Sequence, residues 1–178
     1  PVLSEETFRA KIRNELPPCT YLRTGDLGFV YNGELFVCGR LKDLIIIRGR
    51  NIYPQDVEEA VGQDMQQLRP GCCAAFAILP SEVTSPEPTT VSDDTERLVV
   101  VAEVRDPTLT LADLQTATSS LRARVRRQLS ISPWAVVLLP PRTIPKTTSG
   151  KIARRRCKQA FCGGLLGDLY FWQSPLEL

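Results

Sequence analysis

The sequence predicts an α+β fold, because short apolar runs typical of strands are separated by stretches with helical periodicity. The clearest helical stretch is 110–129, where apolar residues recur every three or four positions. Three runs resemble buried strands, at 72–79, 98–104 and 134–139. A length of 178 residues leaves room for one domain, or for one domain and part of another.

The N-terminal part carries a hairpin signal. Residues 29–31 and 34–37 favour strands and flank Asn32-Gly33, the dipeptide typical of a two-residue hairpin turn. A short helix is expected to begin at Ser4 and to end before Pro17. Pro1 is not a typical first residue, so a fragment of a longer polypeptide is expected.

Charged residues Arg40, Lys42 and Asp43 follow the second strand of this hairpin, and another apolar run, 44–47, comes next. Charges between two buried strands cannot lie in a core without partners. We therefore expect residues 40–43 to lie at the surface or at a domain boundary.

A helix is predicted over 51–61, with Pro54 at its first position and with Asp56, Glu58 and Glu59 near its positive end. The segment 80–96 is rich in proline, serine, threonine and acidic residues, so it is predicted to be a mobile loop.

The C-terminal third begins with a turn-rich loop at 145–151, which leads into a basic helix at 152–161. The aromatic residues 170–172 are expected to be exposed and to dock on a partner. Arginines at positions 122–127 are expected to point outward from their helix.

Composition excludes several classes of function. There is no histidine, so a Ser-His or Cys-His nucleophilic site within the chain is excluded. The six cysteines form no paired CxxC pattern, so no metal centre is expected, and we predict reduced, mostly buried thiols in a cytoplasmic protein. We expect no signal peptide and no membrane-spanning segment, since the sequence has no apolar run long enough to span a membrane.

The net charge of +2 gives no general attraction to nucleic acid, and the clusters 122–127 and 154–156 are interpreted as solvated helix faces. Those basic faces remain candidates for contact with a partner protein that has an acidic surface.

Two motifs are weak when taken singly. Thr24-Gly25-Asp26 is typical of an ordinary turn. The stretch 145–151 has small residues and a lysine near a helix start, where anions are attracted, but it lacks the glycine spacing of a phosphate-binding P-loop.

The order and spacing of three stretches is more specific. These are Tyr21-x-Arg23-Thr24-Gly25-Asp26, then Gly39-Arg40-x-Lys42-Asp43, then Pro145-Lys146-Thr147-x-Ser149-Gly150-Lys151. Together they resemble the C-terminal part of adenylate-forming enzymes, which include acyl-CoA synthetases, luciferases and peptide-synthetase adenylation domains. Two stretches are similar to fatty acyl-AMP ligases in particular. One runs from Arg40 to Glu58 and includes Asn51 and Tyr53-Pro54-Gln55-Asp56. The other is Ser149-Gly150-Lys151-Ile152-x-Arg154-Arg155.

The resemblance implies a domain organisation. Residues 1–41 would be the end of a large N-terminal adenylation domain, with its ribose-binding loop and the hairpin. Residues 42–178 would form the C-terminal lid, a small mixed sheet with flanking helices that works against the N-terminal domain of the same chain.

The resemblance also implies roles for single residues. Asp26 would bind the ribose hydroxyls of ATP, with Arg40, Tyr21 and Thr24 completing the nucleotide site. Lys151 would be catalytic, carried by a flexible loop at 147–150, and would neutralise charge between the carboxylate and the α-phosphate. Mg2+ would accompany ATP, with its ligands outside this chain.

A hinge at Lys42 would alternate two states of the lid. In one state Lys151 would enter the active site for adenylation. In the other state a face formed by Arg48, Gly49 and Asn51 would serve thiol transfer.

The function implied is activation of a fatty acid by ATP to acyl-AMP and pyrophosphate, followed by transfer to the phosphopantetheine thiol of an acyl carrier protein. The fragment alone is expected to be inactive, because the rest of the active site belongs to the N-terminal domain. Two alternatives stay open: an acyl-CoA synthetase, which would use CoA as the acceptor, and a non-catalytic binding module of the same fold.

Overall fold

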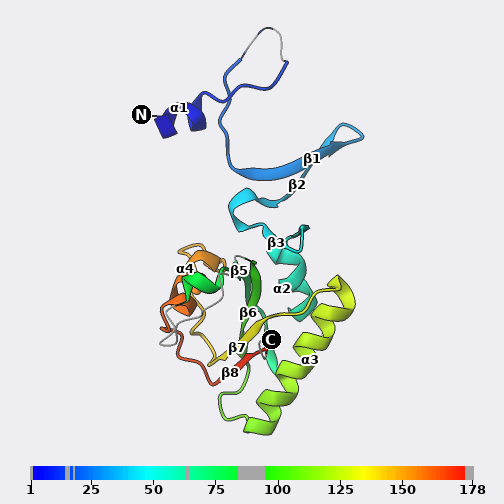
Figure 1. The fold of residues 1–178 in the computed structure, drawn as a ribbon, viewed down its shortest axis with the longest axis vertical. Helices are drawn as coiled ribbons and strands as arrows, with labels where there is room; N and C mark the ends of the chain where they lie inside the picture. Colours follow the sequence, from blue (N-terminus) through cyan, green and yellow to red (C-terminus); the bar gives the residue numbers. More distant parts are fainter. Residues whose placement is uncertain (1, 15–16, 18, 63–64, 84–94, 175–178) are drawn as a thin grey trace. The chain divides into compact units, whose positions relative to one another are not determined.

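The computed structural model describes residues 2–14, 17, 19–62, 65–83 and 95–174. The chain divides into two compact units, Pro1–Asp43 and Leu44–Leu178, each of which is described by itself (Figure 1). Among the described residues, no helix is both long and apolar enough to cross a membrane.

The first unit contains the predicted hairpin. After helix α1 (Val2–Phe8), strand β1 (Asp26–Tyr31) pairs with β2 (Glu34–Arg40) in antiparallel register. Asn32 and Gly33 have φ values of 51° and 81°, the left-handed conformation that this turn requires. The hairpin prediction is confirmed.

A bulge next to Gly28 interrupts the β1–β2 register. A Cβ atom at Gly28 would lie 2.6 Å from the carbonyl oxygen of Phe36, so only glycine fits here. The rings of Phe29 and Phe36 stack with their centroids 5.2 Å apart. Both side chains are nevertheless more than two-fifths exposed. The strand before residues 40–43, which is β2, was expected to be buried, and that expectation is wrong for this chain.

The second unit is built on a mixed four-stranded sheet. Its strands are β5 (Leu68–Ile78), β6 (Arg97–Val104), β7 (Ala135–Leu139) and β8 (Tyr170–Gln173), and they lie in that order. Only β6 and β7 are parallel, because helix α3 (Leu111–Leu129) carries the chain back between them. A small hairpin of β3 (Ile45–Ile47) and β4 (Arg50–Ile52) and helix α2 (Pro54–Gly62) precede the sheet.

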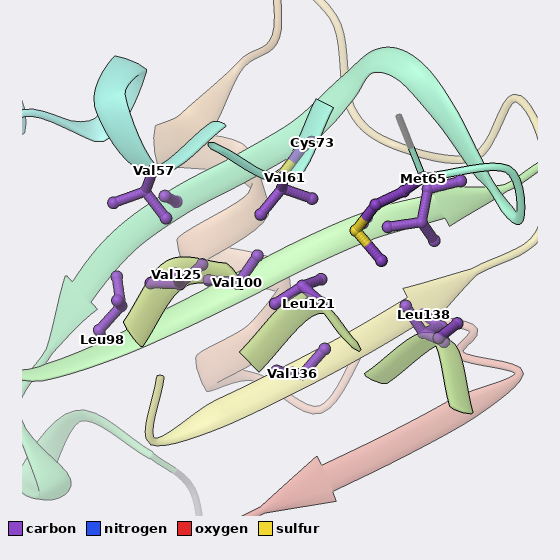
Figure 2. Close-up of a cluster of buried hydrophobic side chains, with 14 of the residues drawn as sticks. Val57, Val61, Met65, Cys73, Leu98, Val100, Leu121, Val125, Val136 and Leu138 are labelled. Carbon is purple, nitrogen blue, oxygen red and sulfur yellow. The ribbon is translucent and has the colours of Figure 1, made fainter. Parts of the chain in front are cut away.

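Helices cover both faces of this sheet, so the sheet is buried on both sides (Figure 1). Helices α2 and α3 pack on one face, where Val57, Val61, Leu121 and Val125 meet Val100 (Figure 2). Helix α4 (Arg154–Cys162) covers the other face through Cys157 and Phe161. The predicted α+β fold, a small mixed sheet with flanking helices, is confirmed.

Helix α3 begins where the sequence predicts. Thr110 caps it by accepting a hydrogen bond from the backbone N–H of Asp113, whose carboxylate bonds back to Thr110. The prediction that its arginines all point outward is wrong for Arg122, which is half-buried with its guanidinium carbon 3.5 Å from the ring centroid of Trp172.

The aromatic tail is also placed differently from the prediction. Tyr170, Phe171 and Trp172 form β8, which pairs with β7 and completes the sheet. Tyr170 and Trp172 pack against the core, while Phe171 is 46% exposed. The prediction that all three aromatic residues are exposed is therefore wrong for Tyr170 and Trp172, which contact their own unit.

Several boundaries differ from the predicted ones. Strand β5 starts at Leu68 rather than at residue 72, because Leu68 also pairs with Val104 of β6 beyond a shift in register between Leu68 and Cys73. Helix α4 starts at Arg154, since Ile152 forms a bridge with Lys146 instead of a helical turn. In the predicted loop 80–96, Pro80–Glu82 forms a short 3-10 helix, and residues 84–94 lie outside the described part of the chain.

None of the six cysteines forms a disulfide bond in the structure, which agrees with the prediction of reduced thiols. Cys72, Cys73 and Cys157 are buried, but the other three are not, so the prediction of mostly buried thiols holds for half of them. Burial raises the pKa of Cys157 to about 12 and raises that of Cys73 well above its usual value. Neither thiol is suited to act as a thiolate nucleophile.

Candidate functional site

The first unit brings together three of the predicted nucleotide-binding residues at the open end of the β1–β2 hairpin. Asp26 begins β1 and lies opposite Arg40, the last residue of β2. The Nε atom of Arg40 lies 3.4 Å from Oδ1 of Asp26. The backbone N–H of Asp26 donates to Oγ1 of Thr24 at 3.1 Å, so Thr24 shapes the turn that presents the carboxylate.

Gly25 is required by this turn. Its φ of 79° is strained for residues with a side chain, and its carbonyl oxygen accepts a hydrogen bond from the N–H of Leu41 at 2.9 Å. Tyr21 is tied elsewhere in the same unit, through two backbone hydrogen bonds with Ala10. The loop 21–26 is therefore anchored at both ends.

The chemistry of this pair suits a neutral diol. The side chains of Asp26 and Arg40 are 39% and 71% exposed, so both can reach a ligand. An ionised carboxylate has two acceptor oxygens, which can accept hydrogen bonds from two neighbouring hydroxyl groups. The adjacent guanidinium balances the charge of the carboxylate and offers further donors.

In the second unit, Lys151 lies at the end of a tight, hydrogen-bonded turn. The backbone N–H of Thr147 donates to the carbonyl of Lys151 at 2.8 Å, and the N–H of Gly150 donates to the carbonyl of Thr147 at 2.9 Å. Oγ1 of Thr147 also accepts from the N–H of Lys151 at 3.2 Å and lies 3.0 Å from Oγ of Ser149. The lysine itself is exposed.

We call residues 145–153 the lysine hairpin. It is closed at its base, where the N–H of Ala153 donates to the carbonyl of Pro145 at 2.9 Å. The flexible loop expected at 147–150 is thus a compact turn with its own hydrogen bonds, and the exposed ammonium projects from a defined support.

The residues assigned to thiol transfer lie together on the β3–β4 hairpin. Arg48 and Gly49 form its turn with φ values of 51° and 73°, and Asn51 follows in β4; all three are exposed. Arg48 therefore occupies the left-handed region, which is unfavourable for a side chain of this kind.

Two polar contacts hold this hairpin against the sheet and α3. The carboxylate of Glu96 accepts the N–H of Ile46 at 2.8 Å, and Arg50 donates to the carbonyl of Leu129 at 3.2 Å. Glu96 was expected only as the end of a mobile loop, and no local pattern indicates its role.

Lys42, the predicted hinge, lies in the 3-10 helix η1 (Leu41–Asp43) and is exposed. The boundary between the two units falls after Asp43. Asp26 and Lys151 lie in different units.

An ion pair that the sequence did not reveal joins α2 to α4. The guanidinium of Arg154 donates to both oxygens of Glu58, at 2.6 Å from Nε and 2.7 Å from Nη2. The interpretation of Arg154 as part of a solvated face is wrong, because its side chain is mostly buried. The interpretation of Glu58 as a charge near the start of α2 did not include this pairing. The sequence did give one indication of their importance: both residues lie in the stretches that resemble fatty acyl-AMP ligases, Glu58 in 40–58 and Arg154 in 149–155.

A second buried carboxylate, Glu103 on β6, was also missed. It is fully buried, is paired with Arg69, and accepts the N–H of Ile144 at 2.8 Å. Burial alone favours the neutral acid, but the N–H groups of Ile144 and Arg142 and the Arg69 guanidinium hold the pKa of this carboxyl below its usual value.

The described residues contain no group of three or more acidic, cysteine or histidine side chains that could hold a metal ion. A groove of about 430 Å3 lies between α3 and the start of β5, lined by Met65, Gln67, Arg124 and Arg127 among others. None of the predicted site residues lines that groove.

Comparison with known proteins decides what this chain is related to. It is 39% identical over 175 residues to the medium-chain-fatty-acid–[acyl-carrier-protein] ligase JamA of Moorena producens. It is 38% identical over 173 residues to the long-chain-fatty-acid–AMP ligase FadD32 of Mycolicibacterium smegmatis. The alignments cover 98% and 93% of this chain, but only 27% of each relative. No protein-family profile matches the chain.

This chain is homologous to the C-terminal part of fatty acyl-AMP ligases. Solved structures agree. The fatty acid AMP ligase from Legionella pneumophila is 32% identical with a TM-score of 0.57, and the match covers 97% of this chain and 28% of that one. The McyG adenylation and carrier protein structure with phenylalanyl-adenylate is 26% identical with a TM-score of 0.67, and covers 90% and 22%.

Proposed function

We propose that this chain is the C-terminal portion of a fatty acyl-AMP ligase that activates a fatty acid with ATP and passes the acyl group to an acyl carrier protein. The single observation that carries the proposal is homology over nearly the whole chain to ligases of this kind. The chain spans about a quarter of those relatives, so the activity belongs to a longer polypeptide.

The first reaction joins the fatty acid to AMP. A carboxylate oxygen of the acid bonds to the α-phosphorus of ATP, the bond to the β-phosphate oxygen breaks, and pyrophosphate leaves. Lys151 is exposed on its hairpin, so its ammonium is available to neutralise the carboxylate and the charge on phosphorus. That role is electrostatic and positional, and it needs no proton transfer.

Asp26 is proposed to bind the ribose of ATP. Its exposed carboxylate, next to Arg40 and held by Thr24, matches a pair of adjacent hydroxyls. Tyr21 supports the same loop through its backbone bonds to Ala10. Mg2+ neutralises the phosphates in such reactions, but the described residues offer no cluster to hold it, so its ligands are assigned to the rest of the polypeptide.

The second reaction transfers the acyl group to the thiol of a phosphopantetheine arm, with release of AMP. We assign Arg48, Gly49 and Asn51 to this step, because they form one exposed turn in the same unit as Lys151. Rotation at Lys42 would exchange the lysine hairpin for this turn. The compact lysine hairpin supports movement of the whole unit rather than of the loop alone.

The test uses the full-length enzyme and measures carboxylate-dependent exchange between pyrophosphate and ATP. Lys151→Ala is expected to lower the exchange rate by about 100-fold or more, as for the loss of one transition-state donor. Arg155→Ala, an exposed cation in the following helix, is the control and should keep the wild-type rate. Exchange at the wild-type rate in Lys151→Ala would contradict the assignment. A wild-type enzyme that binds fatty acid without any exchange would support a non-catalytic binding module instead.

CoA is the alternative acceptor. A putative fatty-acid–CoA ligase of Mycobacterium leprae, fadD21, is 34% identical over 168 residues, with 90% of this chain and 26% of that protein covered. Pantetheinylated carrier protein and free CoA are to be supplied to the full-length enzyme in separate reactions. Acyl transfer to the carrier protein but not to CoA is expected, and the reverse result would make the enzyme an acyl-CoA synthetase.

Exposed arginines of α4 are candidates for contact with the carrier protein. Arg155 and Arg156 are exposed, whereas Arg154 is mostly buried in its ion pair and is excluded from such a surface. Carrier proteins with an acidic surface would be steered toward this face. Arg155→Glu together with Arg156→Glu should raise the apparent KM for carrier protein and spare pyrophosphate exchange, and unchanged loading would count against this contact.

A further inference from the structure

The ion pair between Glu58 and Arg154 belongs to a small polar network in the second unit. The carboxylate of Glu58 accepts three hydrogen bonds, two from Arg154 and one from the backbone N–H of Ala75 at 3.1 Å. The side chains of Glu58 and Arg154 are only 16% and 22% exposed. A two-point contact of this kind fixes the distance and also the relative orientation of the two groups.

The ion pair connects the segment that follows Lys151 to the helix that follows the β3–β4 hairpin. Arg154 is the first residue of α4 and lies three residues after Lys151, directly beyond the closed base of the lysine hairpin. Glu58 lies on α2, which follows directly from the β3–β4 hairpin through Tyr53. Ala75 lies in the middle of β5 and ties the pair to the sheet.

We propose that Glu58 and Arg154 are positioning residues that lock the lysine hairpin to α2 and β5. The orientation of Lys151 is then set by the second unit as a whole, and the two hairpins move as one body. This inference rests on the proposed role of Lys151 in adenylate formation.

Geometry, rather than charge, is the property that matters in this proposal. Lysine at position 154 would keep the positive charge but could not form the planar two-point contact with Glu58. A purely stabilising ion pair would affect the population of folded enzyme, whereas a positioning pair affects the turnover of folded enzyme. The two effects are separable below the unfolding temperature.

The experiment compares Arg154→Lys and Glu58→Gln in the full-length enzyme, with Val61→Ala as the control. Val61 is fully buried on the same helix as Glu58 and belongs to the hydrophobic core, so its truncation should destabilise the unit while leaving the charged groups of the pair in place. We expect kcat for acyl-adenylate formation to fall about 10-fold or more in both pair variants, with KM for ATP and fatty acid within about two-fold of wild type, as for loss of alignment. Val61→Ala should keep the wild-type kcat despite a lower Tm.

The double variant Glu58→Gln with Arg154→Lys adds a coupling test. If the two residues act as one unit, it should be no slower than the slower single variant. If Glu58→Gln fails to fold, Arg154→Lys carries the test alone, since it retains the charge.

Two results would overturn the proposal: a wild-type kcat in Arg154→Lys, or a kcat loss in Val61→Ala as large as in the pair variants. Lys151→Ala, measured in parallel, separates the two claims. An active Lys151→Ala enzyme overturns the proposed function. An inactive Lys151→Ala enzyme with an unaffected Arg154→Lys enzyme overturns only the positioning role.

Discussion

The buried carboxylate of Glu103 accepts the backbone N–H of Ile144 at 2.8 Å, across 41 residues of sequence. This bond fixes the segment that leaves β7 and leads into the lysine hairpin. With Arg69 on its other oxygen, Glu103 has polar partners on both sides. A fully buried charge is tolerated only with such partners.

Glu103→Gln should destabilise the second unit by about 2 kcal/mol, because the amide keeps the shape of the side chain but loses the charge-assisted bonds. Urea unfolding of the full-length enzyme measures the change. Asp168→Asn, at an exposed position of the second unit, is the control and should change the stability by less than about 0.5 kcal/mol. Equal stabilities for the two variants would contradict the role of Glu103.

Glu103 should also contribute to acid sensitivity. Its pKa is lower in the folded protein than the ordinary value of 4.5, so between these two values the unfolded chain binds more protons than the folded one. The stabilisation is complete above the unfolded pKa and is lost as the pH falls through the folded pKa. Urea midpoints measured from about pH 7 down to about pH 3 should fall more steeply for wild type than for Glu103→Gln. Parallel curves for the two proteins would show that another group controls acid unfolding.

The two arginines Arg122 and Arg126 provide a matched comparison on α3. Arg122 lies over the ring of Trp172, whereas Arg126 is exposed. Arg122→Ala should cost about 1–2 kcal/mol through the lost cation–π contact and packing, and Arg126→Ala should be nearly neutral. Thermal unfolding of both variants checks this. Equal Tm values would mean that the stacking on Trp172 adds no stability.

Arg48 should show a conflict between stability and function. Its left-handed backbone suits asparagine better, since Asn-Gly is a preferred turn pair. Arg48→Asn should therefore stabilise the unit by about 0.5–1 kcal/mol. If Arg48 serves thiol transfer, the same change should slow acyl transfer to carrier protein and leave pyrophosphate exchange intact. Faster or unchanged transfer would remove Arg48 from that face.

Lys42→Pro tests the hinge. Proline fixes φ, so it should favour one arrangement of the two units and impair one half-reaction much more than the other. Lys42→Ala, which removes the charge and leaves the backbone free, is the control and should affect neither half-reaction strongly. Pyrophosphate exchange and single-turnover acyl transfer are the two measurements. An equal loss of both in Lys42→Pro would make Lys42 an ordinary surface residue.

Local signals in the sequence were sufficient for much of the fold. Asn32-Gly33 specified the hairpin, and the periodicity of α3 together with Thr110 specified its start. The tail was harder, because alternation of buried and exposed side chains over the four residues of β8 is too short to distinguish a strand from a loose end.

The candidate site was only partly predictable. Motif order drew attention to Asp26, Arg40 and Lys151, but it did not show that Asp26 and Arg40 are paired. The pair Glu58–Arg154 spans 96 residues, and a contact so distant in sequence leaves no trace in local periodicity. Acidic residues near the start of a helix are commonly explained by their interaction with its positive end. Because this explanation was sufficient for Glu58, no pattern in the sequence indicated a distant partner.

The position of β8 at the edge of the sheet has a consequence for shortened chains. Its four residues cover the outer backbone of β7, whose side chains are all buried. A premature stop before Tyr170 would leave an apolar strand, Ala135 to Leu139, with unpaired amides open to a neighbouring molecule. Strand β8 thus protects the second unit from self-association, and forms truncated before Tyr170 should accumulate as aggregates.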